Sequence, residues 1–486
     1  MPPDPTPITL PANSPAPPRP AADFRAPGAI LLISSYELGH APLGIASPAG
    51  FLAQAGYRPA LLDLAVDKLG AEAVGRAAVV GFSVPMHTAL KLAMAAARKV
   101  RTLNPACHLV FFGLYASLNE KLLLRSYADS VIGGEFEPPL LKLVRSLERA
   151  ESAPPEGVSS RDNFAAPRLA RTVFPGPSRW GLPSLTRYAH LVVGEERRTT
   201  GYVEASRGCR HTCLHCPITP VYQGRFFVVS REVVLADIAS QVAMGARHIT
   251  FGDPDFLNGP GHGMAILREM HARFPDVTFD VTAKIEHLLR YRKFLPELAK
   301  SGCLFVVSAV ESLSNRVLEA LNKGHTRADV SEALALVRAA GIALRPSWVA
   351  FTPWTTMEDY LEMVEFVASE GLLHHVEAVQ FAVRLLVPPG SALLGTPQFA
   401  PFAGPLDAET LTHPWSHPDA RMDALHGRVS DIVEQAIRSK EVAEETFSRI
   451  AREAFTLAGQ EERLPPLLSA LKGHPPAPRL SEPWFC

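Results

Sequence analysis

Three of the six cysteines in this 486-residue chain lie close enough together to bind one metal centre. Cys209, Cys213 and Cys216 follow the spacing Cys-x3-Cys-x2-Cys. Thiolates this close cannot all pair as disulfides, and a soft metal or an iron–sulfur cluster is the usual reason for such a grouping. His211 and His215 lie in the same run, so a compact zinc site is a second interpretation. A cluster held by three thiolates would leave one iron open for chemistry.

The cysteine loop follows a short predicted strand, and it resembles the signature of the radical S-adenosylmethionine (SAM) family. In that family an aromatic ring precedes the last cysteine, and His215 holds this place here. The resemblance implies a 4Fe–4S cluster on the three cysteines, whose open iron binds the amine and carboxylate of SAM. It also implies that one electron from the cluster cleaves SAM, with a donor such as flavodoxin or ferredoxin as partner. A zinc-binding or purely structural loop is the alternative.

The elements that must position this loop begin at Gly201, where short apolar runs start to alternate with helical patterns. The predicted strands are 202–205, 248–251, 277–281, 304–310, 342–351 and 376–386. Six strand–helix units fall short of the eight that close a barrel, and a partial barrel is the known radical SAM core. We therefore expect a partial (β/α)6, TIM-like barrel over residues 201–395. Thr355 and Glu358 predict a capping box at the start of the helix 357–370.

Polar residues follow the carboxyl ends of the predicted strands, where barrel enzymes build their active sites. Asp253, in Phe-Gly-Asp-Pro, resembles the Gly-Gly-Glu-Pro turn of the family, which implies that its carboxylate binds the SAM ammonium. Asp255 is a competing candidate for this role. Lys284 follows the next strand, either as a site residue or as an ordinary charge at the rim.

Two further positions are candidates for binding SAM. Glu311 and Ser312 end a predicted strand where the family commonly contacts the ribose or the methionine part of SAM. Arg345 lies inside the strand 342–351, and its guanidinium fork suits the SAM carboxylate. The predicted cofactor-binding residues are therefore Asp253, Glu311, Ser312, Arg345 and His215.

Residues 29–150 show a second alternation of buried strands and helices. The pattern predicts a doubly wound, Rossmann-like parallel sheet, with ligands bound past the carboxyl ends of its strands. Such a domain ahead of a radical SAM core resembles the cobalamin-binding module of many such enzymes. The sequence has no Asp-x-His-x-x-Gly, so no histidine of that motif can bind cobalt, and it has no Gly-x-Gly-x-x-Gly for a dinucleotide. A domain that keeps this fold without cobalamin is the alternative.

The remaining segments and the composition complete the expected organisation. We expect a disordered proline-rich leader at 1–28, a linker at 151–200, a helical region at 396–472 and a tail at 473–486. The net charge of −1 does not favour nucleic acid as a partner. The chain has no apolar run long enough to span a membrane. The grouped cysteines fit a reducing compartment, so we expect a cytoplasmic protein. We also expect a small-molecule substrate.

The chain also resembles a narrower family, named for its Cys-Sec-Ala-Glu-Pro or Cys-Cys-Ala-Glu-Pro tail. The shared blocks include VPMHTALKLA, GLYASLNEKLL, GGEFE, GYVEASRGCRHTCLHCP and RLLVPPGS. The sequence stops at Cys486, where the family would continue with selenocysteine or cysteine. Truncation at a selenocysteine codon is one hypothesis, with Cys486 as a candidate catalytic thiol, and a natural end is the other.

This narrower resemblance bears on the reaction. The tailed family looks related to the enzyme of the arsinothricin pathway, which implies transfer of a 3-amino-3-carboxypropyl group from SAM to a soft acceptor such as arsenite. Cobalamin-dependent methylation by a radical SAM transferase is the first alternative. A non-catalytic iron–sulfur or zinc protein is the second.

Overall fold

The computed structural model describes residues 23–471 and 476–482. The chain forms two compact units. One contains most of residues 23–182, and the other contains residues 183–482 together with the short segments 38–43 and 169–176. The expected linker at 151–200 is therefore divided between the two units.

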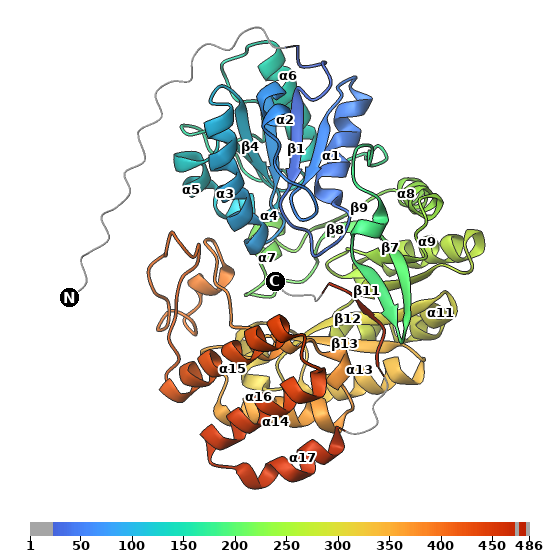
Figure 1. The fold of residues 1–486 in the computed structure, drawn as a ribbon, viewed down its shortest axis with the longest axis vertical. Coiled ribbons are helices and arrows are strands. Elements are labelled where there is room, and N and C mark those ends of the chain that lie inside the picture. The colour runs from blue at the N-terminus through green and yellow to red at the C-terminus, as the bar shows by residue number, and fades with distance from the viewer. Residues whose placement is uncertain (1–22, 472–475, 483–486) are drawn as a thin grey trace, which may run out of the picture. The chain divides into compact units, whose positions relative to one another are not determined.

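The first unit is built on a parallel sheet, with the strand order β2-β1-β3-β4-β5 among the described residues (Figure 1). Every residue of β1, β3, β4 and β5 is buried, as expected of a parallel sheet that is covered on both faces. The strands are β1 (Ile30–Ser34), β2 (Ala60–Asp63), β3 (Val79–Ser83), β4 (His108–Phe112) and β5 (Ser130–Ile132). The helices are α1 (Leu43–Gln54), α2 (Ala71–Arg76), α3 (His87–Leu103), α4 (Leu114–Leu118), α5 (Glu120–Ser126) and α6 (Glu137–Glu148).

The second unit is built on a larger sheet, ordered β13-β12-β11-β10-β7-β6-β14 in the described part of the chain. The strands from β7 to β13 pair in parallel, and β6 and β14 pair antiparallel at one edge. The strands are β6 (His190–Val193), β7 (Glu196–Val203), β10 (His248–Phe251), β11 (Thr278–Thr282), β12 (Cys303–Glu311), β13 (Ala343–Trp348) and β14 (Arg479–Leu480). The expected combination of a Rossmann-like domain and a partial barrel is thereby confirmed.

Helices follow each parallel strand of the second unit, and those before α14 return the chain to the next strand. They are α8 (Arg231–Ala243), α9 (Pro260–Arg273), α10 (Ile285–Arg290), α11 (Leu295–Lys300), α12 (Asn315–Ala320), α13 (Arg327–Ala339) and α14 (Met357–Ser369). The capping box of α14 is formed by Thr356 and Asp359, one residue later than predicted. The hydroxyl of Thr355 instead pairs with that of Thr352, at 2.8 Å.

The sixth strand, predicted at 376–386, does not form. Residues Ala378–Phe381 make a 3-10 turn, and a single parallel bridge joins Phe351 to Arg384. The Gln380 side chain accepts a hydrogen bond from the Trp348 backbone N–H at 2.9 Å. The Gln380 side-chain oxygen thus accepts the hydrogen bond from β13 that a backbone carbonyl of a sixth strand would otherwise accept.

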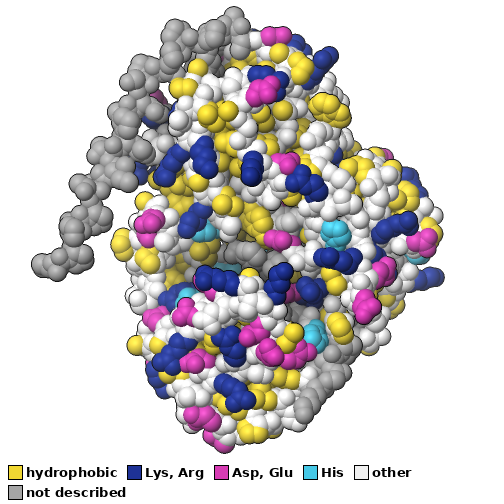
Figure 2. Space-filling view, viewed as in Figure 1, with side chains coloured by type: hydrophobic (Ala, Val, Ile, Leu, Met, Phe, Trp, Pro, Cys, Tyr) yellow, Lys and Arg dark blue, Asp and Glu magenta, His cyan; other side chains and the backbone are white. Residues whose placement is uncertain are grey.

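The C-terminal region is helical and then returns to the sheet. Its helices are α15 (Ala420–Ser439), α16 (Ala443–Ala458) and α17 (Leu464–Ala470). After them, β14 covers the outer edge of β6, and the Pro478 carbonyl accepts a hydrogen bond from the Arg345 guanidinium at 3.2 Å. Among the described residues, no helix is both long and apolar enough to cross a bilayer. Basic and acidic side chains are interspersed on the face shown in Figure 2.

Candidate functional site

The cysteine loop connects the two strands of a short antiparallel hairpin, β8 (Ser206–Gly208) and β9 (Phe226–Val228). Gly208 has a φ of +73°, and a Cβ there would lie 2.5 Å from the Arg225 carbonyl oxygen and from the Tyr222 ring. Only glycine fits this close turn. The turn directs the chain from β8 into Cys209.

The three cysteines are free thiols, with Cys213 buried and the other two partly exposed. Burial raises the pKa of Cys209, and it raises the pKa of Cys216 to about 12. Without a metal the thiols of Cys209 and Cys216 therefore stay protonated, and a metal would displace these protons on binding. The Asn258 amide donates to the Cys209 Sγ at 3.6 Å, and its oxygen accepts from the Arg210 N–H at 3.2 Å. This set of three soft donors fits an iron–sulfur cluster with three protein ligands.

Glu311 connects the end of β12 to the cysteine loop. One carboxylate oxygen accepts from His215 Nε2 at 3.1 Å and from Lys323 Nζ at 3.2 Å. Burial would raise the pKa of Glu311, but Lys323 and His215 outweigh it and lower this pKa to about 2. The carboxylate is thus ionised although it is only 7% exposed. Ser312 follows directly and is also buried, and its hydroxyl accepts from the Ser314 N–H at 3.1 Å.

The backbone of Glu311 is strained. Its φ is +67°, in the left-handed region that side chains rarely adopt, and a bulge in the β12–β13 register lies beside it. Strain of this kind costs about 1–3 kcal/mol and often marks a functional site. The sequence pointed to Glu311 but not to Lys323, because a lysine in a turn after a helix has no distinguishing pattern.

Asp253 lies at the end of β10 but turns toward the start of β8. Its two oxygens accept hydrogen bonds from the Ala205 N–H at 2.9 Å and from the Ser206 hydroxyl at 2.5 Å. Burial raises the pKa of Asp253 to about 7, although these two hydrogen bonds oppose the shift. Asp253 therefore ties β10 to the hairpin, and its role in binding SAM stays a prediction.

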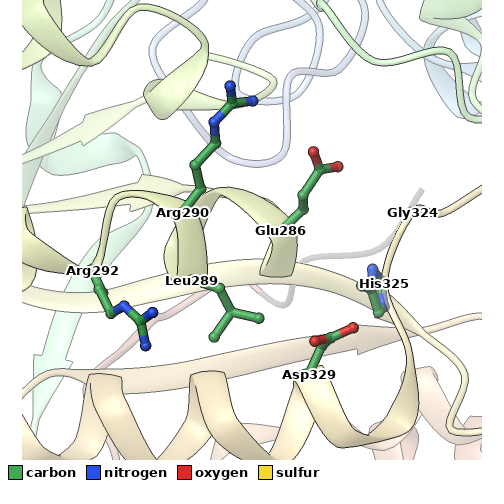
Figure 3. Close-up of a pocket in the computed structure, with 7 residues that line it drawn as sticks. All are labelled: Glu286, Leu289, Arg290, Arg292, Gly324, His325 and Asp329. Atoms are coloured by element: carbon green, nitrogen blue, oxygen red, sulfur yellow. The ribbon is translucent and has the colours of Figure 1, made fainter.

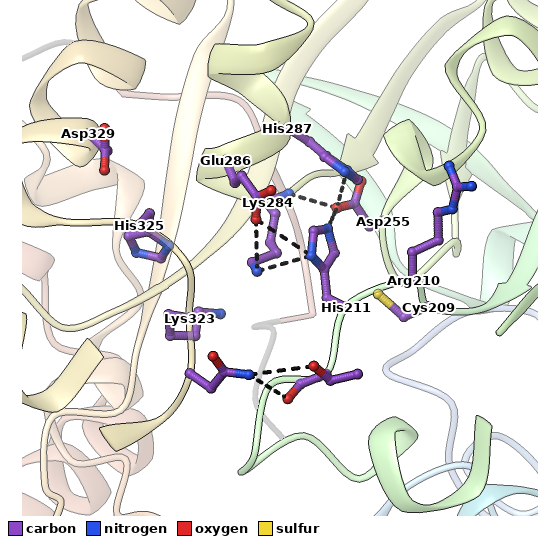
Figure 4. A network of polar contacts seen from close by, with 12 residues as sticks. Cys209, Arg210, His211, Asp255, Lys284, Glu286, His287, Lys323, His325 and Asp329 are labelled. Carbon is purple, nitrogen blue, oxygen red and sulfur yellow. Dashed lines mark hydrogen bonds and ion pairs between the residues drawn. The ribbon is translucent and has the colours of Figure 1, made fainter. Parts of the chain in front are cut away.

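Asp255 and Lys284 lie together with His211 of the cysteine loop, as Figure 4 shows. Asp255 Oδ2 lies 2.8 Å from His287 Nδ1 and 3.5 Å from His211 Nε2. On the other side of the His211 ring, Nδ1 lies 3.2 Å from Lys284 Nζ and 3.6 Å from a Glu286 oxygen. The competing candidate Asp255 thus belongs to a separate polar cluster, in which His287 was not expected from the sequence.

Arg345 does not lie at the rim where the cysteine loop is held. It is the third residue of β13, and its guanidinium donates to Glu377 at 2.6 Å and to the carbonyls of His374 and Pro478. These acceptors, all from the protein, satisfy the buried positive charge of the Arg345 guanidinium. The assignment of Arg345 to the SAM carboxylate stays a prediction without support from the structure.

A pocket of about 320 Å³ opens beside this cluster, between α10 and the turn that leads into α13 (Figure 3). Its lining mixes two arginines with two carboxylates, so it has no single charge. The lining residues are Glu286, Leu289, Arg290, Arg292, Gly324, His325 and Asp329.

The rim of the first unit has features that fit cobalamin. Gly134 follows β5 with a φ of +68°, and a Cβ there would lie 2.3 Å from the Arg168 carbonyl oxygen, so the turn requires glycine. Glu135 and Glu137 are fully buried, and the Ser47 hydroxyl donates to Glu137 at 2.7 Å. Hydroxyls and carboxylates in the segments that follow parallel strands, here Glu135 after β5, Glu137 at the start of α6 and Ser47 in α1, suit a ligand rich in amide N–H groups, as the side chains of a corrin are.

Two family models match the chain. Residues 203–367 match the radical SAM superfamily, and residues 29–144 match the B12 binding domain. The chain therefore joins a domain that matches the B12-binding model to a domain that matches the radical SAM model. A radical SAM domain implies a 4Fe–4S cluster and SAM as cofactors, and the match to the B12-binding model supports cobalamin as the ligand of the first domain. The expected cobalamin module is thus confirmed.

Two curated relatives each match a little over a third of the chain. A tRNA-2-methylthio-N(6)-dimethylallyladenosine synthase of Desulfosudis oleivorans is 29% identical over 178 residues, 35% of this chain and 38% of that protein. The ribosomal protein uS12 methylthiotransferase RimO of Geobacter sulfurreducens is 29% identical over 203 residues, 37% of this chain and 40% of that protein. The chain spans about two fifths of the length of these relatives.

Solved structures show the same fold over more of the chain. The cobalamin-dependent SAM radical enzyme OxsB, with aqua-cobalamin and SAM bound, has a TM-score of 0.69 and 16% identity, covering 89% of this chain and 70% of that chain. The methyltransferase TsrM from Kitasatospora setae has a TM-score of 0.56 and 18% identity, covering 68% of each chain. At these identities the likeness concerns the fold alone.

Proposed function

We propose that the protein is a cobalamin-dependent radical SAM methyltransferase that acts on a small molecule. The observation that carries this proposal is the joining of two sites in one chain: a three-thiol loop beside the ionised Glu311, and a cobalamin-type sheet with a glycine turn at Gly134. When bound, the cluster supplies the electron for SAM cleavage, and cobalamin supplies a methyl carrier.

The chain's own residues position SAM at the rim of the barrel. Glu311 offers a fixed negative charge to hydrogen-bond donors of SAM, its ammonium or its ribose hydroxyls. Lys323 holds this carboxylate in its ionised form, and His215 holds it against the cysteine loop. Ser312, next to Glu311, adds a hydroxyl to the same strand end.

Transfer of a 3-amino-3-carboxypropyl group to a soft acceptor such as arsenite is the second candidate function. It is supported by the sequence blocks that resemble the tailed family, from VPMHTALKLA to RLLVPPGS. The candidate thiol of that hypothesis, Cys486, lies outside the described residues. In both functions the partners are a small-molecule substrate and an electron donor such as flavodoxin or ferredoxin, in the cytoplasm.

Product analysis distinguishes the two functions. The protein is reconstituted without oxygen, loaded with cobalamin, and incubated with SAM, a strong reductant and candidate acceptors. S-adenosylhomocysteine and 5′-deoxyadenosine with a methylated product support the first function, and methylthioadenosine supports the second. If SAM is not consumed while absorbance and iron counting show an intact cluster, both functions are wrong.

A further inference from the structure

Two histidines and one aspartate from three separate elements meet beside the cysteine loop. His211 comes from the loop, Asp255 follows β10, and His287 lies in α10. Their ligand atoms all lie within 4.8 Å of one another. His287 and Asp255 are buried, and His211 is mostly buried.

The contacts within this group are short, but they do not form ordinary hydrogen bonds. His287 Nδ1 lies 2.8 Å from Asp255 Oδ2, and His211 Nε2 lies 3.5 Å from the same oxygen. Within the described ranges, neither nitrogen has a hydrogen-bond partner in acceptable geometry. Two buried, unsatisfied imidazole nitrogens that converge on one carboxylate indicate that a further atom belongs between them.

We propose that His211, Asp255 and His287 bind a divalent transition-metal ion of the zinc class, separate from the cluster. Such an ion binds imidazole nitrogen and carboxylate oxygen at about 2.0–2.2 Å, which places tetrahedral ligands about 3.3 Å apart. The two contacts, at 2.8 and 3.5 Å, lie on either side of that value. Two histidines and one carboxylate leave coordination positions open for water or a substrate donor atom.

The surroundings hold these ligands as they are held in known metal sites. The Leu257 N–H donates to Asp255 Oδ1 at 2.9 Å, which fixes the carboxylate. A Glu286 oxygen lies 3.6 Å from His211 Nδ1, behind the nitrogen that faces the ion. A carboxylate behind a histidine ligand orients the ring and raises its basicity.

A hydrogen-bond chain without a metal is the rival arrangement. In it, Lys284 Nζ donates to His211 Nδ1 at 3.2 Å, and His211 Nε2–H points toward Asp255. This chain of hydrogen bonds requires the Lys284 ammonium, whereas a metal ion would be repelled by that positive charge. It also leaves His287 Nδ1 without a partner in good geometry. Lys284 therefore separates the two arrangements, whichever reaction the enzyme catalyses.

The test is a titration with Co²⁺, whose visible d–d absorption reports nitrogen and oxygen ligands. The full-length chain carries Cys209→Ser, Cys213→Ser and Cys216→Ser, so that the cluster thiols cannot bind the probe. About one equivalent of Co²⁺ is expected to bind, and Zn²⁺ is expected to displace it. His287→Gln should abolish this binding, while the matched control His271→Gln, in the last turn of α9, should keep it.

Two further variants test the surroundings. Glu286→Gln should weaken Co²⁺ binding about 10- to 100-fold, as expected for a residue that orients a ligand. Lys284→Met should keep or tighten binding, because it removes a neighbouring positive charge. Circular dichroism and melting midpoints confirm folding, and Asp255→Asn serves as a second ligand variant.

The proposal is wrong if the cysteine-free chain binds Co²⁺ no more tightly than its His287→Gln form. It is also wrong if the cysteine-free chain binds Co²⁺ only after Lys284→Met, since the hydrogen-bond chain that requires Lys284 would then occupy the site in the native protein. Because no SAM is present, failure here is distinct from failure of the proposed enzymatic function.

Discussion

Asp253 and Glu311 are both buried carboxylates, at the carboxyl ends of β10 and β12 in one sheet. Their pKa values nevertheless shift in opposite directions, to about 7 for Asp253 and about 2 for Glu311. Among the described residues the donors to Asp253, Ser206 and Ala205, are neutral, whereas Glu311 has the ammonium of Lys323. Burial is common to both, so the partner determines the charge. The cation thus makes the Glu311 site the anionic one.

Removal of the cation should have the largest effect. Lys323→Met leaves Glu311 buried without its charged partner, so we expect the unfolding free energy to fall by about 3–5 kcal/mol. Urea denaturation of the cluster-free protein measures this loss. The control Lys300→Met, at an exposed position at the end of α11, should change stability by less than about 0.5 kcal/mol. Equal effects of the two variants would show that the ion pair does not stabilise the fold.

The pH dependence of stability should have opposite signs at the two carboxylates. Between its ordinary pKa of 3.8 and about 7, Asp253 keeps a proton that the unfolded chain loses, so stability falls as pH rises. Between about 2 and the ordinary 4.5, the unfolded chain binds the proton at Glu311, so stability is lost as pH falls.

A substitution isolates the contribution of Asp253 to the pH dependence of stability. Asp253→Asn should remove a loss on the order of 3 kcal/mol between pH 4 and 7. Urea midpoints across this range measure it, with the exposed Asp276→Asn as control. An unchanged slope in Asp253→Asn would mean that Asp253 is already ionised at low pH.

SAM binding should depend more on Glu311 than on Asp253. Glu311→Gln removes a charge-assisted hydrogen bond of about 1.5–3 kcal/mol, so SAM should bind about 10- to 100-fold more weakly. Asp253→Asn should weaken binding less, because Ala205 and Ser206 already occupy its oxygens. Equilibrium dialysis of the reconstituted protein measures both. The reverse order would instead support the prediction that Asp253 binds the SAM ammonium.

The smallest effect is expected at the neutral donor. Ser206→Ala removes one hydrogen bond from Asp253, and the unfolding free energy at pH 5 should fall by about 1 kcal/mol. Because the lost bond opposed the effect of burial, the pKa of Asp253 should rise further. Urea midpoints above and below pH 7 detect both changes. A loss as large as that of Lys323→Met would remove the distinction between the two strand ends.

The sequence was most informative where local spacing determines the outcome. The cysteine loop and the polar residues after each strand can be predicted from the order of residues alone. The structure places two of the residues predicted in this way, Glu311 and His215, beside each other. Lys323 could not be predicted, because its role depends on a turn that returns to β12. The SAM-binding role of Arg345 stays a prediction: the sequence identifies its strand, but not its depth in the strand or its partner Pro478.

Two errors in the fold have similarly local causes. The strand predicted at 376–386 was displaced by one side chain, Gln380, which satisfies the backbone of Trp348. The capping box shifted by one residue because Thr355 found a closer hydroxyl partner in Thr352. Side-chain hydrogen bonds of this kind compete with regular backbone pairing and leave no periodic signal.

The pairing of β14 with β6 has a practical consequence for handling the protein. Arg479 and Leu480 cover the outer edge of β6, and Pro478 supplies one of the acceptors of Arg345. Proteolytic clipping ahead of Pro478 would bare an edge strand and leave a guanidinium short of an acceptor. Uncovered edges recruit strands from other molecules, so clipped preparations should be the ones that aggregate on storage.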